Sequence, residues 1–383
     1  MDNRRIKFLL VFFLIFFGMN FYVGVKLFQL IVHIYPEIRV AFFGVTYMLI
    51  ALTIILGRMP LAVPIRKPIA WIGAHWLGVF IYLFLFFLVA DIIILAGSGV
   101  RLIPAHELQE VRFYAGMAVI LLTVAVVGYG LHNATKIINV SYEIQLKRNL
   151  TREMNIILIS DLHLGDINSE SRLKDIVDGI ISLNPDIVCI VGDIFGDHFS
   201  SIRDPDRASK LLKGIGATFG VYAVFGNHDS GSSMPQMVDF LESSSIILLK
   251  DEHVIINDEL VLIGRLDGSP IREFDNMSRR DFVDVLAEVA EGVDDTLPIV
   301  VMDHNPAHIG EYGDEVDLIL AGHTHKGQIY PGGLFTRRMF VVDYGHYTRP
   351  LDGLQVIVSQ GVHTWMMPMR VGSNNEIVRV VVR

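Results

Sequence analysis

The sequence predicts a chain of two parts with different fold classes. The first is an N-terminal all-α transmembrane bundle, and the second is an α/β domain with two packed mixed β-sheets flanked by helices. Hydrophobic residues make up 52% of the 383 residues, and their excess is concentrated before about residue 135. Four apolar stretches in that half approach the ~20 residues that a helix needs to cross a bilayer. From Asn155 onward, short β-branched runs alternate with helical patterns, which is typical of an α/β domain.

We therefore place a transmembrane helical domain at residues 1–135, a polar linker at 136–154 and the α/β domain at 155–383. The apolar stretches of the first domain cover residues 8–27, 40–56, 69–95 and 113–131. The second stretch is the shortest, so the prediction is of about four helices. A cleaved signal peptide is the alternative for the first stretch, but no small-residue cleavage site follows it. A retained first helix is the better interpretation.

Lysine and arginine are concentrated in alternate segments between these stretches. The N-terminal tail, the second connection and the segment after the fourth stretch hold most of them. Because positively charged loops stay preferentially in the cytoplasm, an even number of spans places both termini and the α/β domain there. The sequence thus predicts a multi-pass integral membrane protein with a cytoplasmic α/β domain. An odd number of spans would place that domain on the other side.

Charge and cysteine content exclude several classes of protein. The formal net charge of −9 leaves no broad basic surface, so general nucleic-acid binding is not expected, although a small nucleotide substrate is compatible with it. The single cysteine, Cys189, lies in an apolar run that reads as a buried strand. One cysteine permits neither a disulfide framework nor a thiolate metal cluster.

The α/β half shows strand and helix patterns in alternation. Strands are expected near residues 156–161, 187–192, 221–225, 246–249, 260–263, 299–302 and 318–321, and helices near 173–181, 208–212 and 279–291. Three further strands, 339–342, 355–359 and 377–382, lie close together in the sequence. Their spacing favours a mixed or antiparallel arrangement, which completes two packed sheets.

Five polar fragments follow predicted strands directly. They are Asp161-Leu-His163, Gly192-Asp193, Gly226-Asn227-His228-Asp229, Asp303-His304-Asn305-Pro306 and Gly322-His323-Thr324-His325. The carboxyl ends of strands in α/β sheets gather ligands into a shared crevice. Carboxylate, amide and imidazole groups suit a divalent metal, and Asp193 can bridge two cations. A single Asp-x-His pair is weak support, but five such fragments together predict a metal centre.

This ordered series resembles the calcineurin-like metallophosphoesterase superfamily, specifically its membrane-associated branch with Gly-His-Thr-His-x-Gly-Gln near the end. The resemblance covers about residues 155–383, including Val358-Ser-Gln-Gly361. It implies the αββα fold and two divalent ions of manganese, iron or zinc. One ion would be held by Asp161, His163, Asp193 and His325, and the other by Asp193, Asn227, His304 and His323. His228 would contact the phosphoryl oxygens or protonate the leaving group.

The implied activity is direct attack of a metal-bridging hydroxide on a phosphomonoester, phosphodiester or pyrophosphate bond. The substrate would be a phosphorylated small molecule or a lipid-linked molecule. Gly192-Asp-Ile-Phe-Gly196 lacks the Asp-Arg-Gly continuation of the protein serine/threonine phosphatases in this superfamily, which argues against a phosphoprotein substrate. Lys326 stands where this branch often has glycine, and it is either a substrate-phosphate contact or a solvated side chain.

Several alternatives accompany this interpretation. Asp166, Asp197, His198 and Asp229 are either partners of the metal ligands or surface turn residues, and the second interpretation is favoured. A non-catalytic membrane scaffold or sensor is the alternative function. A transporter or channel would rest only on the apolar helices with His75 and Asp91, which we expect near span ends, where water or headgroups solvate them.

Overall fold

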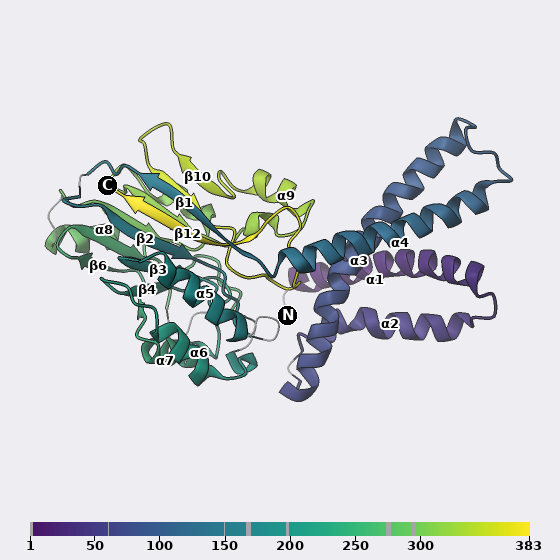
Figure 1. Ribbon diagram of the computed structural model, residues 1–383, viewed down its shortest axis with the longest axis horizontal. Helices are drawn as coiled ribbons and strands as arrows, with labels where there is room; N and C mark the ends of the chain where they lie inside the picture. The colour runs from purple at the N-terminus through teal and green to yellow at the C-terminus, as the bar shows by residue number, and fades with distance from the viewer. Residues whose placement is uncertain are drawn as a thin grey trace. The chain divides into compact units, whose positions relative to one another are not determined.

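The computed structural model describes residues 3–59, 61–148, 150–165, 170–196, 199–272, 277–292 and 296–383. The chain divides into two compact units, Met1–Gly130 and Leu131–Arg383 (Figure 1). The first is called the helical unit below, and the second the α/β unit.

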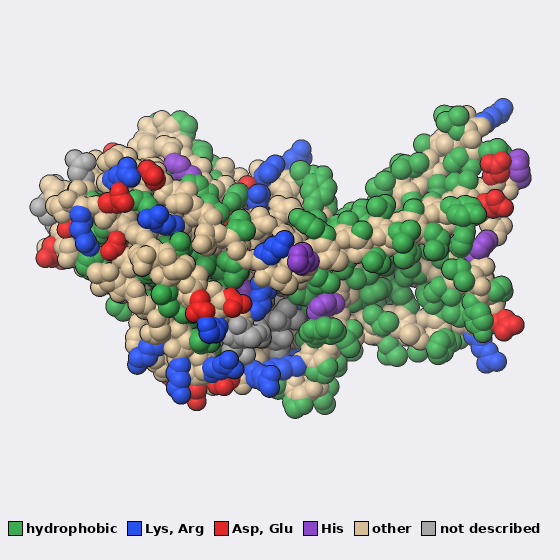
Figure 2. All heavy atoms as spheres, viewed as in Figure 1, with side chains coloured by type: hydrophobic (Ala, Val, Ile, Leu, Met, Phe, Trp, Pro, Cys, Tyr) green, Lys and Arg blue, Asp and Glu red, His purple; other side chains and the backbone are tan. Residues whose placement is uncertain are grey.

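The helical unit consists of long apolar helices. They are α1 (Asn3–Ile34), α2 (Val40–Leu56), α3 (Val63–Gly99) and α4 (Leu108–Asn133). Within the described residues, α1, α3 and α4 are long and apolar enough to cross a membrane, whereas α2 is a shorter apolar helix. Many hydrophobic side chains of these helices are exposed, and they are prominent along the helices in the face that Figure 2 shows, as expected of helices that face lipid.

Two polar side chains singled out in the sequence, Asp91 and His75, have hydrogen-bond partners within this unit. The Lys26 ammonium lies 2.6 Å from Asp91 Oδ1, and the Tyr22 hydroxyl donates to Asp91 Oδ2 at 2.6 Å. His75 is half-buried, and its Nδ1 lies 2.8 Å from the carbonyl oxygen of Trp71. Asp91 is therefore held by two partners, which reduces the cost of placing a carboxylate in an apolar bundle.

The α/β unit contains two six-stranded mixed sheets. The first has the order β1 (Ile137–Ile144), β12 (Asn375–Val382), β2 (Met154–Ile159), β3 (Ile187–Val191), β4 (Val221–Val224) and β5 (Ile247–Leu248). The second has the order β10 (Gly345–Thr348), β11 (Gln355–Val358), β9 (Leu318–Ala321), β8 (Ile299–Met302), β7 (Leu260–Gly264) and β6 (Glu252–Ile256). Strands β2 to β5 are mutually parallel, as are β7, β8, β9 and β11.

Alternation of side chains along each strand builds the layers. In β2, Ile156 and Leu158 belong to a buried cluster that also contains β7, β8, β9 and β11 residues, so it lies between the sheets. Ile157 and Ile159 face the other way, into a cluster with residues of the outer helices. Because successive strand residues point to opposite faces, a strand buried on both faces reads as a continuous apolar run. Cys189 on β3 is buried as predicted.

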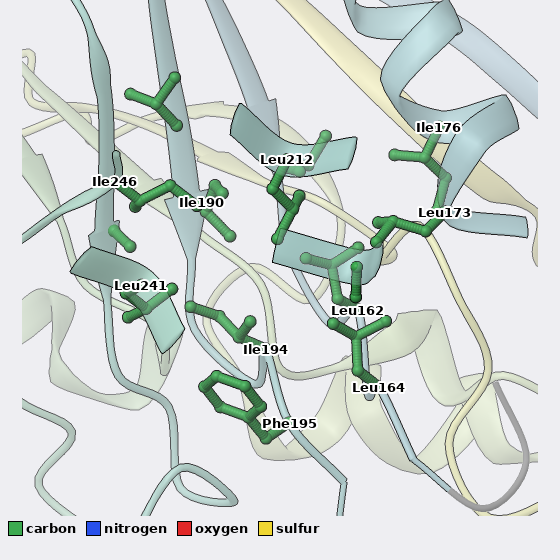
Figure 3. Close-up of a cluster of buried hydrophobic side chains, with 14 of the residues drawn as sticks. Leu162, Leu164, Leu173, Ile176, Ile190, Ile194, Phe195, Leu212, Leu241 and Ile246 are labelled. Carbon is green, nitrogen blue, oxygen red and sulfur yellow. The ribbon is translucent and has the colours of Figure 1, made fainter. Parts of the chain in front are cut away.

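Helices cover the outer faces of both sheets. On the first sheet lie α5 (Glu170–Ser182), α6 (Pro205–Lys213) and α7 (Met234–Ser243), and Figure 3 shows Leu173, Leu212 and Leu241 in the cluster they bury. On the second sheet, α8 (Phe282–Gly292) contributes Phe282, Val285 and Val289 to a third cluster. The remaining helices are α9 (Gly332–Met339) and the 3₁₀ turns η1 (Phe199–Ser201), η2 (Pro306–Glu311) and η3 (His325–Gly327). The fold class predicted from the sequence, helices outside two packed mixed sheets, is confirmed.

Two expectations about individual segments differ from the structure. The segment 136–154, predicted as a linker, contains β1, which pairs in parallel with β12 from Ile137–Asn375 to Ile144–Val382. The strand predicted at 339–342 is wrong, because α9 continues to Met339 and the Phe340 amide bonds back to Thr336. The strand beside β11 is β10 instead, and Val341 is 74% exposed.

Candidate metal centre

The polar fragments identified in the sequence extend from the carboxyl ends of five strands. The residues Asp161 and His163 follow β2, Asp193 follows β3, Asn227 follows β4, His304 follows β8, and His323 and His325 follow β9. Strands β2, β3 and β4 are parallel neighbours in one sheet, and β8 and β9 are parallel neighbours in the other. The polar ends therefore gather at one end of the two packed sheets.

The first cluster consists of Asp161, His163 and His325, which offer ligand atoms within 4.8 Å of one another. His325 Nε2 lies 3.3 Å from Asp161 Oδ1 and 3.2 Å from His163 Nε2. The other oxygen of Asp161 accepts from the Ser160 hydroxyl at 2.5 Å and from the His323 amide at 3.2 Å. One carboxylate oxygen is thus fixed by the protein, and the other faces two imidazole nitrogens.

The second cluster consists of Asp193, His304 and His323, again within 4.8 Å. Asp193 Oδ2 lies 3.4 Å from His304 Nε2 and also 3.7 Å from His163 Nε2 in the first cluster. Asn227 Oδ1 lies 2.8 Å from His323 Nδ1. All seven residues predicted as ligands therefore come together, and Asp193 stands between the two clusters.

Hydrogen bonding shows that a cation fits here. His304 Nδ1 lies 2.9 Å from the carbonyl oxygen of Val191, so Nδ1 carries a proton and Nε2 is the ring atom that faces Asp193. Among the residues that the structure describes, buried Asp161 Oδ1 and His304 Nε2 have no hydrogen-bond partner. Buried polar atoms are rarely left unpaired, and a metal-binding histidine commonly donates its other N–H to a carbonyl. This donor set fits divalent metal ions.

The backbone at the clusters adopts a conformation that is uncommon for residues with side chains. Positive φ angles occur at Asp161 (57°), His163 (43°), Asp193 (50°), His323 (70°) and His325 (49°). Non-glycine residues in this region cost free energy and persist where the surroundings hold them, often at functional sites. Five of the seven predicted ligands share this feature, which indicates that the loops are shaped by the site.

Two glycines allow these loops to approach one another. Gly192 has φ +73°, which a tight turn requires. At Gly226 the reason is space, because a Cβ atom there would lie 2.3 Å from Asp193 Oδ1 and 2.5 Å from the Asp193 amide nitrogen. The Asp193 carboxylate, which faces His163 of the first cluster as well as His304 of the second, thus packs directly against the backbone after β4.

Electrostatics favour positive charge between these side chains. Burial lowers the pKa of His163 to about 3 and that of His323 to about 4, so both imidazoles are neutral and available as ligands. Burial alone would raise the pKa of Asp193, but the facing His304 holds it well below its ordinary value. Burial likewise lowers the pKa of His304, and the facing Asp193 raises it well above normal. The position between Asp193 and His304 therefore attracts a cation.

His228 lies at the edge of the clusters. Its backbone amide donates to Asp193 Oδ1 at 2.9 Å. Its ring centroid is 5.1 Å from that of His163 and 5.9 Å from that of Trp365. The residue predicted to contact the phosphoryl group thus stands beside the ligands and is not itself in either cluster.

Asp229 differs from its sequence interpretation. It is fully buried and accepts hydrogen bonds from the amides of Gly226 (2.9 Å), Ile194 (3.1 Å) and Phe195 (2.8 Å). Burial and the charge of Asp193 raise its pKa to about 7. The favoured interpretation as a surface turn residue is wrong, because Asp229 ties the loop after β3 to the loop after β4. Asp166, Asp197 and His198 lie outside the described residues.

Sequence reasoning missed two buried partners of the ligand loops. The Arg370 guanidinium lies 3.2 Å from both His325 Nδ1 and the His325 carbonyl oxygen, and burial lowers its pKa to about 10. His363 Nδ1 lies 2.8 Å from the carbonyl oxygen of Leu162, between Asp161 and His163. No motif marks either residue. Lys326 lies 4.2 Å from the centre of the Tyr344 ring, a cation–π arrangement.

Fold and site together define a metal-dependent hydrolase, and comparison with known proteins identifies its family. Residues 154–327 match the family model described as calcineurin-like phosphoesterase. An uncharacterised metallophosphoesterase of Aquifex aeolicus is 32% identical over 232 residues, which cover 60% of this chain and 85% of that protein. The chain therefore belongs to the calcineurin-like phosphoesterase family, and it is a phosphoester hydrolase.

Two further relatives carry more specific names. A transmembrane protein with metallophosphoesterase domain from Danio rerio is 26% identical over 333 residues, covering 81% of this chain and 74% of that protein. A UDP-2,3-diacylglucosamine pyrophosphatase of Chlamydia trachomatis is 22% identical over 248 residues, covering 51% of this chain and 71% of that protein. The first of these matches extends into the apolar helices.

Proposed function

We propose that this chain is a membrane-anchored hydrolase that cleaves a phosphoester or pyrophosphate bond in a lipid-linked substrate with two divalent metal ions. The observation that carries the proposal is the pair of clusters that share Asp193, whose Oδ2 lies 3.4 Å from His304 and 3.7 Å from His163. A carboxylate in this position can serve two cations. Manganese, iron and zinc all suit the mixed oxygen and imidazole ligands.

Each residue has a role in this proposal. Asp161, His163 and His325 hold the first ion, Asn227, His304 and His323 hold the second, and Asp193 contacts both. Bound there, the ions would activate a water molecule and neutralise charge on the phosphoryl group. His228 is beside the clusters, where its ring can donate a hydrogen bond to the phosphoryl oxygens or a proton to the leaving group.

A lipid-linked substrate is supported by two observations. Among the described residues, three helices are long and apolar enough to cross a membrane, and such helices would keep the hydrolase domain near a bilayer. One relative is named UDP-2,3-diacylglucosamine pyrophosphatase, and the compound in that name is a diacylated sugar nucleotide. A substrate with an apolar tail and a phosphorylated head would be available to an enzyme held at the membrane.

We further propose that the helices form a multi-pass anchor with the hydrolase domain in the cytoplasm. The lysine and arginine distribution supports this orientation if α2 (Val40–Leu56) spans the membrane with the other three helices. Tags at the two termini can be tested for protease access in sealed, oriented membrane vesicles. Termini on the same, cytoplasmic side are expected, and termini on opposite sides would refute four spans.

The central experiment is metal analysis combined with turnover. Full-length protein in detergent is assayed for manganese, iron and zinc and for hydrolysis of bis(p-nitrophenyl) phosphate. Asp193→Asn should lose bound metal and lower turnover on the order of 10³-fold, since several kcal/mol of transition-state stabilisation depend on the ions. Asp239→Asn on the exposed face of α7 is the matched control and should behave as wild type. Equal activity in wild type and Asp193→Asn would refute the proposal.

A further inference from the structure

Helix α9 and the residues after it expose apolar and basic side chains together. Phe335 is 65% exposed, Met339 74% and Leu334 49%, and Val341 follows them in the chain. Arg337 and Arg338 on the same helix are also exposed. We call these six residues the α9 surface; basic and hydrophobic side chains adjoin over this region in Figure 2. Soluble surfaces seldom expose several large apolar side chains side by side unless something covers them.

The α9 surface is fixed to the loop that carries the metal ligands. Gly327, two residues after His325, packs so closely on the start of α9 that a Cβ atom there would lie 2.1 Å from the Gly333 nitrogen. Thr324, between His323 and His325, donates to the Asp343 carbonyl oxygen at 2.5 Å, and Thr336 of α9 donates to Asp343 Oδ2 at 2.7 Å. The position of α9 is therefore fixed relative to the loop that carries His323 and His325.

The residues before α9 are hydrogen-bonded to the loop at residues 370–373, which is also hydrogen-bonded to the end of the last apolar helix. Within the α/β unit, Asn133 Nδ2 donates to the carbonyl oxygens of Arg370 (3.2 Å) and Ser373 (2.9 Å). On the other side of this loop, the Tyr330 amide donates to Val371 O at 2.8 Å, and the Ser373 hydroxyl donates to Gln328 O at 2.7 Å. Since Asn133 is the last residue of α4, α9 lies near the point where the chain enters the α/β unit after the apolar helices.

We propose that the α9 surface rests in the headgroup region of the lipid bilayer and keeps the metal centre open to amphiphilic phosphate compounds whose apolar tails remain in the membrane. The substrate part of this inference rests on the proposed function. Leu334, Phe335 and Met339 insert among the acyl chains near the headgroups, while Arg337 and Arg338 pair with lipid phosphates. An eight-residue helix is too short to bind a membrane stably alone. Here the transmembrane helices supply a high effective concentration, so a weak contact suffices.

Site-directed fluorescence tests the contact without relying on catalysis. The only cysteine, Cys189, is fully buried, so Phe335→Cys can be labelled selectively with an environment-sensitive fluorophore. The matched control is Val283→Cys on α8, which is 71% exposed. Full-length protein is reconstituted into vesicles of phosphatidylcholine and phosphatidylglycerol that contain lipids with nitroxide-labelled acyl chains. Quenching is expected for the label at 335 and not at 283. Equal fluorescence loss at both positions, or none at 335, would overturn the proposal.

Turnover in two formats tests the consequence for substrates. Leu334→Ser, Phe335→Ser and Met339→Ser are combined in one variant, whose positions are exposed and outside the ligand set. Hydrolysis of soluble bis(p-nitrophenyl) phosphate should stay within about twofold of wild type, while hydrolysis of vesicle-embedded phosphatidyl-p-nitrophenol should fall about tenfold, equivalent to about 1.4 kcal/mol. Val283→Ser should change neither. Equal losses on both substrates would show a merely structural role and refute the inference.

The two measurements separate this inference from the proposed function. If wild-type protein hydrolyses neither substrate, the proposed function fails, and quenching at 335 still decides the membrane contact. If hydrolysis is seen without quenching at 335, the proposed function stands and the membrane contact is refuted. A label at 335 that is shielded from water but not quenched by lipid would indicate a protein partner or a second copy of the chain, and would also refute it.

Discussion

His304 stands between a carbonyl oxygen and a carboxylate, with Nδ1 2.9 Å from Val191 O and Nε2 3.4 Å from Asp193 Oδ2. The first contact places a proton on Nδ1, and the second aims Nε2 at a carboxylate. A cation between Nε2 and Asp193, either a proton or a metal ion, satisfies both groups. The ring is therefore oriented by the backbone of β3 before any metal arrives.

His304→Gln should remove a ligand of the second ion and leave the first cluster intact. We expect bound metal to fall from two ions per chain toward one, and turnover to fall on the order of 10³-fold because one of two cations that stabilise the transition state is lost. Elemental analysis of the purified protein gives the count. His253→Gln, at a histidine in neither cluster, is the control. Retention of two ions by His304→Gln would contradict the assignment.

Gly226→Ala should disable the site by a steric clash alone, because it changes no ligand. The new methyl group would collide with Asp193, whose Oδ1 would lie only 2.3 Å from the added Cβ atom. Overpacking of this kind costs about 1–3 kcal/mol of stability, and here it displaces the shared carboxylate, so metal content and turnover should fall as well. Gly216→Ala, where nothing lies within 4 Å of the added carbon, provides the control. Unchanged metal content in Gly226→Ala would show that Asp193 is not required where it stands.

Asp229→Asn should weaken metal binding without removing a ligand. An asparagine amide cannot accept all three hydrogen bonds from Gly226, Ile194 and Phe195, and it turns an NH₂ group toward one of these donors. We expect a loss of about 1–3 kcal/mol in the free energy of unfolding and a metal affinity lower by about 10–100-fold. Titration of metal-free protein with manganese measures the affinity, with Asp239→Asn as control. Wild-type affinity in Asp229→Asn would mean that the two loops hold their positions independently.

Stability should depend on the protonation of His363. Burial lowers its pKa to about 3 in the folded chain, against an ordinary value of 6.5. The unfolded chain binds the proton more readily, so His363 favours the folded state fully above pH 6.5, and this contribution is lost as the pH falls toward 3. At pH 5.5 the loss is about 1.4 kcal/mol.

Thermal unfolding of full-length protein in detergent between pH 8 and pH 5.5 measures this contribution. The fall in melting temperature should be smaller in His363→Gln than in wild type. His346→Gln, at an exposed histidine, should keep the wild-type slope. Identical slopes in wild type and His363→Gln would show that His363 binds protons equally in the folded and unfolded chains.

The sequence predicts the sheets and the metal centre because both are local patterns. Strands such as Ile156–Ile159 read as apolar runs, since a strand covered on both faces needs apolar residues at every position. The ligand residues follow directly at the strand ends. Parallel strands then bring those ends to one edge without further information from the chain.

The missed features depend on contacts between distant residues. Strand β1 pairs with β12 at the far end of the chain, and of its eight residues only Ile144 is buried, so the segment resembles a polar connector. Arg370 belongs to no sequence motif. Its partners are backbone carbonyl oxygens and the ring of His325, which only the fold brings close to it. Asp229 is adjacent to His228 in the sequence, yet only the fold shows that it is enclosed by two loops. The strand predicted at 339–342 is wrong for a different reason. Its apolar residues resemble a buried strand, but Val341 is exposed and belongs to neither sheet.

The left-handed backbone at Asp161, His163, Asp193, His323 and His325 restricts which amino acids can replace them. Aspartate, asparagine and histidine enter that region more readily than most residues with side chains, and they are also good donors to divalent metals. Each position therefore has two requirements. The first is a donor atom for the metal, and the second is a residue type that tolerates these main-chain dihedral angles. Glutamate retains the carboxylate of Asp161 or Asp193 but meets only the first requirement. A chemically conservative exchange can therefore fail here for a reason that ligand chemistry alone does not reveal.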